Sequence, residues 1–250
     1  MSTERPQPAT QPHDAVEPAP IISLHDPRAI QILSTEHWSV LTARSLAYNE
    51  AFVRAGMFLT FLSTSLIALA LLADAMAFSD RFLTVAAIVL AFDFVIGVTT
   101  FGRISGANAD DLRAMHGMAR IRHGYIQAAP VVQPYFTTAV HDDPPSVVAG
   151  YGTSASGGTL AGILYGLTTS IGMIGLIVAM VGGVLAGVLA MLAGVGADAV
   201  LWIALLAGVV VFVALVAFVM RQVPINWAQL DVRFPAVDDD TPSEADDAAR

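Results

Sequence analysis

Cysteine and lysine are both absent from the 250-residue sequence. Without cysteine, the chain has no disulfide, no thiol nucleophile and no cysteine-based zinc or iron–sulfur site. All basic residues are arginines, which excludes a lysine Schiff base and a P-loop lysine. Ser-His-Asp spacing and the HExxH, GxGxxG and paired-carboxylate motifs are also missing. We therefore expect no enzyme, no cofactor and no metal ion.

Charge is scarce and unevenly placed. Charged residues make up 13% of the chain, where a soluble domain has about a quarter. None occurs between Asp143 and Asp198, or between Asp198 and Arg221. A soluble fold would need charged surface in these stretches, so the lipid bilayer is the better solvent for them. The net charge of −9 makes the chain a poor nucleic-acid binder, because phosphates repel it.

Hydropathy predicts four membrane spans. Each needs about 20 apolar residues to cross the hydrocarbon core. The third apolar run, Thr159 to Ala197, is too long for one ordinary span and lacks a polar turn inside. We expect one long helix there; the alternative is a span followed by a re-entrant piece broken at Gly182-Gly183. The expected spans are 52–73, 82–101, 160–191 and 199–220.

The remaining segments are polar. Residues 1–33 are rich in proline and predict a disordered tail, and 223–250 predict an acidic C-terminal tail. Ser34-Thr35-Glu36 signals the start of an amphipathic helix over 36–51, and the loop 102–158 contains a second helical pattern over 107–127. The predicted fold is an all-α, polytopic membrane helix bundle, with four spans in two hairpins and cytoplasmic juxtamembrane helices.

Arginine placement predicts the orientation. Eleven of the twelve arginines fall on the side that carries both tails and the loop 102–158, and only Arg81 falls on the other. By the positive-inside rule, both termini and this loop are cytoplasmic. Arginine in place of lysine also favours a GC-rich bacterial genome, so we expect the inner (plasma) membrane of a bacterium.

Two stretches resemble known proteins. They are EHWSVLTARSLAYNEAFVRAG over 36–56 and GMARIRHGYIQAAPVVQPYF over 117–136. Both are similar to a group of bacterial multi-span membrane proteins, mainly from actinobacteria, and the resemblance covers about residues 26–222. This group has no established activity, so the resemblance implies no catalytic residues. The layout of the first hairpin also looks like the two-helix SLATT effectors of bacterial conflict systems, which are proposed to form pores; the second hairpin departs from that pattern.

Asp93 is an acidic residue at membrane depth. A carboxylate there costs about 2.5–3.5 kcal/mol on insertion scales, and such residues face a bundle interior or a water path. It predicts either an ion or proton site, repeated in an oligomer, or a hydrogen-bonded group that holds helices together. Arg54 is a conceivable ion-pair partner, although snorkelling or a pair with Glu50 one turn away fits it better. Hydroxyl partners for Asp93 are available on the first span at Thr60, Ser63, Thr64 and Ser65.

The helix over 107–127 carries a polar face. His116, Arg120 and His123 recur on it at helical spacing. With Asp110 and Asp111 they could hold a divalent metal or an anion, but the arginine repels a cation, so a face packed on protein or wetted by cytosol is the better interpretation. Arginines of this helix, Arg113, Arg120 and Arg122, could instead contact anionic lipid heads. The sequence His141-Asp142-Asp143-Pro144-Pro145 predicts a solvated turn.

Glycines concentrate in the third apolar run. Small residues four apart make a flat helix face that permits close contact between backbones. We expect this span to be buried centrally, in the bundle or at an oligomer interface. The pairs at this spacing are formed by Gly158, Gly162, Gly166, Gly183 and Gly187.

These features lead to two main hypotheses for function. The first is a homo-oligomeric channel- or transporter-like protein that uses Asp93. The second is a structural, scaffolding or regulatory membrane protein without transport or catalysis, with a cytoplasmic protein partner. An enzyme acting on lipid ranks last, because no catalytic motif supports it. The expected partners in every case are the lipid bilayer and further copies of the chain.

Overall fold

The computed structural model describes residues 23–149 and 166–236, and every regular element in these ranges is helical. Four helices are long and apolar enough to cross a membrane, which confirms the predicted all-α bundle of membrane type. The elements are α1 (Pro27–Met76), α2 (Asp80–Ala128), the 3₁₀ helix η1 (Pro130–Tyr135), α3 (Pro144–Ala149), α5 (Ser170–Leu192) and α6 (Ala197–Ala228).

Helix α1 begins earlier than the sequence indicated. Asp26 is its N-cap, because the side chain accepts a hydrogen bond of 2.8 Å from the backbone N–H of Arg28. Pro27 occupies the first turn, where a backbone N–H would have no acceptor within the helix. Residues 27–33 are therefore helical and do not belong to a disordered tail. Of the rest of that predicted tail, residues 23–26 lead into the helix and residues 1–22 lie outside the described residues.

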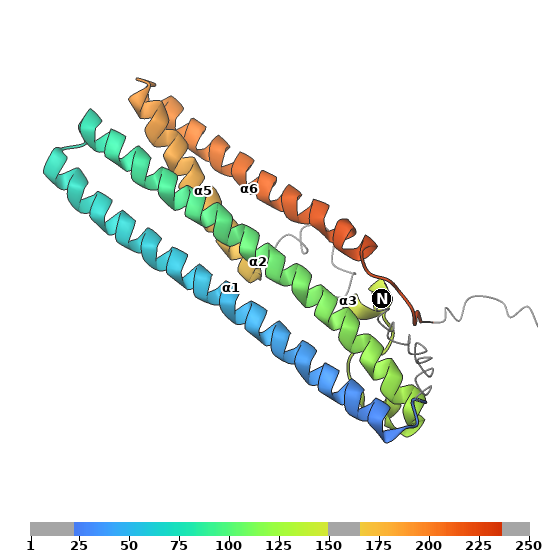
Figure 1. Ribbon diagram of the computed structural model, residues 1–250. Coiled ribbons are helices and arrows are strands. Elements are labelled where there is room, and N and C mark those ends of the chain that lie inside the picture. The colour runs from blue at the N-terminus through green and yellow to red at the C-terminus, as the bar shows by residue number, and fades with distance from the viewer. Residues whose placement is uncertain (1–22, 150–165, 237–250) are drawn as a thin grey trace, which may run out of the picture.

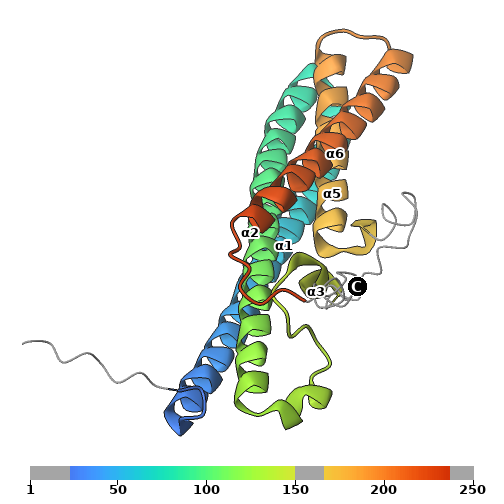
Figure 2. The ribbon, with the colours of Figure 1, turned by 90° about the vertical axis from the view of Figure 1, so that its right-hand side faces the viewer.

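Helices α1 and α2 are much longer than a bilayer requires. The expected juxtamembrane helix 36–51 continues into the first span without a break, and 107–127 continues from the second. At 1.5 Å per residue, the 50 residues of α1 extend about 75 Å, against about 30 Å of hydrocarbon. Figures 1 and 2 show both helices running far past the beginning of α5. We call residues 27–51 and 102–128, with η1, α3 and residues 229–236, the projecting unit.

A regular seam joins α1 to α2. The buried residues of α1 recur at intervals of four and three residues, the spacing that lets two helices interlock over a long distance. The hairpin turn between them uses two consecutive non-glycine residues in the left-handed region, Ala77 and Phe78, with φ of 49° and 52°. The seam residues on α1 are Ala51, Ala55, Phe58, Leu62, Ser65, Leu69 and Ala73.

Helix α5 differs from the expected long helix over 160–191. It begins at Ser170, because Thr169 has an extended backbone and its side chain caps the helix by accepting from the N–H of Gly172 at 3.2 Å. From there α5 runs unbroken through Gly182 and Gly183, so no re-entrant break occurs at that step. Residues 160–165 lie outside the described residues.

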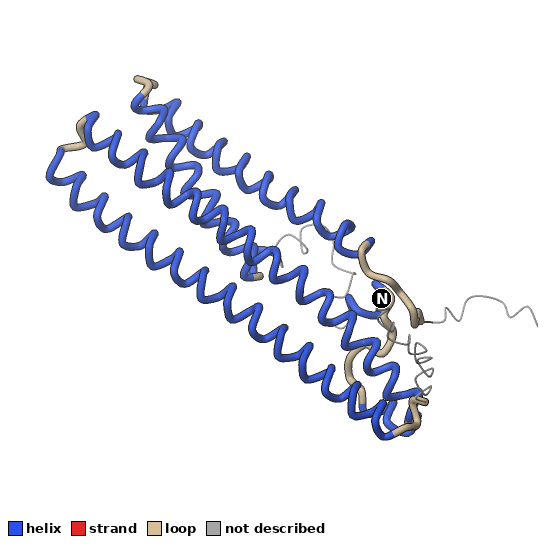
Figure 3. The backbone as a smooth tube through the Cα atoms, viewed as in Figure 1, coloured by secondary structure: helices blue, strands red, loops and turns tan. Residues whose placement is uncertain are grey.

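The four long helices form an open array (Figures 1 and 3). Helix α2 packs against α1 on one side and α5 on the other, and α6 packs on α5. Half of the most apolar stretch of α5 is buried, whereas none of the corresponding stretch of α6 is. Because α1 and α6 do not close on each other in the described part of the chain, both remain edge helices.

Candidate functional site

Asp93 lies in the seam between α1 and α2, with no exposed surface. The Ser65 hydroxyl, on the facing helix, donates a hydrogen bond of 3.1 Å to its Oδ1. Its second oxygen, Oδ2, has no hydrogen-bond partner among the described residues. The carboxyl group therefore links two helices and has no direct contact with solvent.

The other polar residues expected near Asp93 point elsewhere. Thr60, Ser63 and Thr64 are exposed, and each hydroxyl donates to the carbonyl one turn earlier on its own helix, at 2.8–2.9 Å. Arg54 does not reach Asp93 either: its Nε donates to Glu50 at 3.1 Å. The interpretation as a local pair with Glu50 fits this geometry.

The hydroxyls of α1 border an open groove on the outer surface of the first hairpin. Its volume is about 820 Å³, and Arg54 lies at one end. Helix α2 contributes Thr99 and Thr100, whose hydroxyls both donate to the carbonyl of Ile96. The groove is therefore lined by hydroxyl groups that already have internal acceptors.

Ion pairs hold α1 to α2 in the projecting unit. Arg44 pairs with the buried Asp111 through its Nε, and Arg103 donates to Glu50 at 2.7 Å. Burial and the neighbouring Asp111 carboxylate raise the pKa of Tyr48 to about 12, so this phenol stays protonated. The two helices are thus tied by polar contacts where the apolar seam ends.

Asp142 is the centre of the strongest polar cluster in the projecting unit. Its fully buried carboxylate accepts hydrogen bonds from the backbone N–H of Arg233 at 2.9 Å, the N–H of Phe234 at 2.7 Å and the Nε of Arg120 at 2.7 Å. Its own N–H donates to the carbonyl of Phe234 at 3.2 Å. Burial raises the pKa of the Asp142 carboxyl, but the hydrogen bonds outweigh it and the net pKa is lowered.

The three residues of the predicted polar helix face all meet this cluster. His116 is buried, with Nε2 3.2 Å from the carbonyl of Asp231 and 3.9 Å from Asp142. The ring of His123 stacks on Phe234, with centroids 4.3 Å apart. The face binds residues 231–234 of its own chain, so packing on protein describes it better than wetting by cytosol.

Asp143 secures the end of the same segment. Its Oδ1 accepts from the backbone N–H of Ala236 at 2.9 Å, and Oδ2 accepts from the N–H of Ser146 at the start of α3. Hydrogen bonds from these groups hold the pKa of Asp143 below its usual value, despite burial. The predicted solvated turn is therefore wrong for Asp142 and Asp143: both carboxylates bind the chain's own C-terminal residues.

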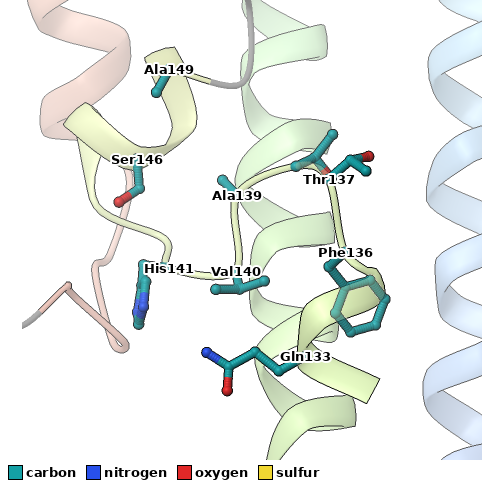
Figure 4. Close-up of a pocket in the computed structure, with 9 residues that line it drawn as sticks. Gln133, Phe136, Thr137, Ala139, Val140, His141, Ser146 and Ala149 are labelled. Atoms are coloured by element: carbon teal, nitrogen blue, oxygen red, sulfur yellow. The ribbon is translucent and has the colours of Figure 1, made fainter. Parts of the chain in front are cut away.

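A pocket of about 390 Å³ lies beside this cluster, within the segment 133–149 (Figure 4). Gln133, His141 and Ser146 are among its polar lining residues. The Ser146 hydroxyl donates to Asp143 at 2.9 Å, so it is engaged in capping and not directed to the histidine. Among the described residues, no three His, Cys, Asp or Glu side chains are grouped closely enough to hold a metal ion.

Gly183 and Gly187 of the third apolar run lie at the interface with α6. A Cβ added to Gly183 would lie 2.7 Å from the carbonyl oxygen of Ala204, and one on Gly187 would lie 3.2 Å from the Ala204 Cβ. Gly166 has open space around it, and Gly158 and Gly162 lie outside the described residues.

The comparisons supply no family. No protein-family model, no curated protein and no solved structure matches the chain.

Sequence reasoning found the polar face of α2 but missed its partner. Asp142 and Phe234 are 92 residues apart, so no local pattern connects them. The sequence feature that could have indicated the site is the adjacent pair Asp142-Asp143, which follows a helix with two histidines and an arginine on one face.

Proposed function

We propose that the protein is a regulatory or scaffolding protein of the bacterial inner membrane, with no transport or catalytic step. Four spans anchor it, and the projecting unit is the part that other molecules meet. Eleven arginines on the side of both termini support a cytoplasmic location for this unit. A cytoplasmic protein is the proposed partner, together with lipid and further copies of the chain; nucleic acid is not.

The observation that carries this proposal is the buried Asp142 carboxylate. A buried charge persists only when it is well paired, and Asp142 has three donors within 2.7–2.9 Å. Two of these donors are backbone groups of residues 233 and 234, so the carboxylate fixes residues 229–236, which we call the C-terminal segment, onto α2. A unit assembled from the loop 129–149, α2 and residues 229–236 is a surface built from distant parts of the chain, which favours a role in recognition.

The environment of Asp93 supports the same reading. A site that passes ions needs access to water, but this carboxyl group is fully buried and hydrogen-bonded to Ser65. Interhelical hydrogen bonds of this kind stabilise membrane bundles by about 0.6 kcal/mol on average. The proposed role of Asp93 is to fix the register of α1 on α2.

Reconstitution tests this proposal. The wild-type chain and Asp93→Asn would be placed in liposomes at equal density, and proton and cation flux measured with entrapped dyes. We expect flux no greater than in protein-free liposomes for both chains, because Asp93 serves packing alone. Wild-type flux that disappears in Asp93→Asn would instead establish a transport role for the carboxyl group.

One observation favours the channel-like alternative. The groove of about 820 Å³ lies along the spanning segments and is lined by Thr60, Thr64 and Thr99. Hydroxyl groups on the outer face of a span can border water in an oligomer. If this alternative holds, flux persists in Asp93→Asn and falls when Thr64→Leu narrows the groove. The same liposomes therefore separate the two candidate functions.

A further inference from the structure

The outer face of α1 in the projecting unit carries an uncovered stripe. Trp38 on this stripe and Leu46 beside it are 66% and 67% exposed, although soluble helices normally bury such side chains. Exposed positions recur along this face at intervals of four and three residues, the period of a two-stranded coiled coil. We call these positions the α1 stripe: Trp38, Thr42, Ser45, Asn49, Phe52 and Gly56.

Lipid does not explain the upper part of the stripe. Glu50 pairs with Arg103 and Arg54, and a group of three charges is expected at or outside the membrane surface. Trp38 lies twelve residues before Glu50, about 18 Å farther along the helix axis, whereas the headgroup layer is only about 5–8 Å thick. Lipid can cover Phe52 and Gly56, but Trp38 must be covered by something other than lipid.

The stripe carries no charge. The charged residues between Trp38 and Gly56, namely Arg44, Glu50 and Arg54, all lie off it. Arg44 turns inward to Asp111, and Glu50 is held by Arg103. Copies of one membrane protein share one orientation, so in a twofold pair each residue near the axis meets itself at the same depth. A charge there would face an equal charge, and an uncharged stripe avoids this repulsion.

Asn49 adds a specific recognition element. Asn49 lies eleven residues after Trp38, three steps along the stripe, and therefore occupies a core position of the repeat. A single asparagine at such a position favours parallel two-stranded pairing, because its amide can hydrogen-bond to its counterpart across the axis. The neighbouring Thr42, Ser45 and Gly56 are small enough to allow close approach of the helices.

We propose that two copies of this chain pair in parallel through the α1 stripe, from Trp38 to the membrane surface at Phe52 and Gly56. The pairing leaves the existing arrangement intact, since α1 is an edge helix whose seam with α2 lies on a different face from the stripe. Leu41 and Leu46 flank the stripe and would cover it from both sides. The pairing is independent of whether the protein scaffolds or transports.

Single-cysteine cross-linking in native membranes tests this, because the wild-type chain contains no cysteine. Thr42→Cys and Ser45→Cys place thiols on the stripe, and Ala43→Cys places one on the same helix, exposed but off the stripe. Under mild oxidation we expect disulfide-linked dimers from the two stripe variants at about ten times the rate seen for Ala43→Cys, since only core positions meet across the axis. Equal rates at all three positions, or no dimer at any, would overturn the proposal.

A charge insertion gives a second readout in chains that still fold. In the Thr42→Cys background, Asn49→Glu puts two like charges on the axis, and Ala43→Glu puts the same charge off it. We expect cross-linking to be lost with Asn49→Glu and retained with Ala43→Glu. Residues 1–22 are the competing occupant: cross-linking that appears only after their deletion would mean that they cover the stripe, and would contradict pairing in the full chain.

Discussion

The carboxylate of Asp142 illustrates how one residue can organise a distant part of the chain. Its side chain is fully buried, and its two oxygens receive donors from α2 and from the C-terminal segment. A carboxylate in such a place is favourable only while these donors remain, because an unpaired buried charge costs several kcal/mol. The residue is therefore a sensitive point for the closure of the projecting unit.

Replacing this carboxylate should free the C-terminal segment. Asp142→Asn removes charge-assisted hydrogen bonds worth about 1.5–3 kcal/mol each, so docking should weaken by at least about 2 kcal/mol. The chain has no lysine, so trypsin cuts only after arginine. We expect cleavage after Arg233 to accelerate more than tenfold, a factor that corresponds to about 1.4 kcal/mol.

Asp110→Asn is the matched control for this variant. Asp110 lies on α2, the helix that carries Arg120, but it is exposed and pairs with Arg113 on the surface. Exposed pairs contribute about 0–1 kcal/mol, so cleavage after Arg233 should stay near the wild-type rate. A similar acceleration in both variants would mean that Asp142 has no special role.

Docking of the C-terminal segment should resist mild acid. The docked state lowers the pKa of Asp142, so the carboxylate stabilises docking at every pH above its free value of about 3.9, and that stabilisation is lost only as pH falls through the lower docked value. A spin label at Ala236→Cys should stay immobile from pH 8 to about pH 4. His116 and His123 also face the segment, and the difference between the wild type and Asp142→Asn isolates the carboxylate. Mobility of the wild-type label already at pH 6 would contradict this assignment.

Residues were predictable where their partners are local. The i,i+4 pair of Glu50 and Arg54 follows from helical spacing, and so does the polar face of His116, Arg120 and His123. The roles of Asp142 and Asp143 were missed, because their backbone partners in residues 233–236 lie 91 to 93 residues away and the flanking prolines suggested a solvated turn. For Asp93, depth in the span was evident, but the register of two long helices decided that Ser65 and not Thr64 faces it.

Among the elements, the contact between α5 and α6 depends on small residues. The backbone of α6 approaches Gly183 so closely that an added Cβ would lie 2.7 Å from a carbonyl oxygen. Gly102 on α2 has open space instead. We expect Gly183→Ala to destabilise the protein by about 1–3 kcal/mol through overpacking. Gly102→Ala should be neutral or stabilise it by up to about 1 kcal/mol, because alanine is the better helix former.

Thermal unfolding in nanodiscs measures both glycine variants under the same conditions. The expected result is a lower midpoint for Gly183→Ala and an unchanged or higher midpoint for Gly102→Ala. If both substitutions lower the midpoint equally, close approach to α6 is not the reason why position 183 is glycine.

The elements were predictable where hydropathy or a strong local signal defines them. The two spans of the first hairpin follow from runs of apolar residues, since lipid tolerates no charged surface. The start of α1 was misplaced because Ser34-Thr35-Glu36 resembles a cap, although the sequence Asp26-Pro27 carried the stronger signal. The start of α5 was misplaced because Thr169 lies within an apolar run, and hydropathy does not register a backbone change there.

On the scale of the whole molecule, the open array gives two very different ends. One end holds only the turns at residues 77–79 and 193–196, and the other holds the projecting unit and the start and end of the described chain (Figure 1). The distribution of arginine predicts that the second end faces the cytoplasm. This orientation is open to direct measurement.

Membrane-impermeant maleimide labelling tests the orientation. Gln127→Cys lies in the projecting unit and Gly196→Cys in the turn between α5 and α6; both positions are exposed. We expect Gln127→Cys to react in inside-out vesicles only, and Gly196→Cys in intact spheroplasts only. The opposite pattern would invert the topology, and labelling of both positions from one side would contradict two complete hairpins.

The link between Asp142 and residues 233 and 234 has a consequence for biosynthesis. Asp142 leaves the ribosome 91 residues before its backbone partners, and α5 and α6 must be inserted in between. Until residues 233 and 234 have been made, the Asp142 carboxylate can bind only Arg120 and water. Residues 233 and 234 thus complete the projecting unit only after both spans of the second hairpin have been made, so a chain that stops before them would expose an incomplete unit that proteolytic quality control can recognise.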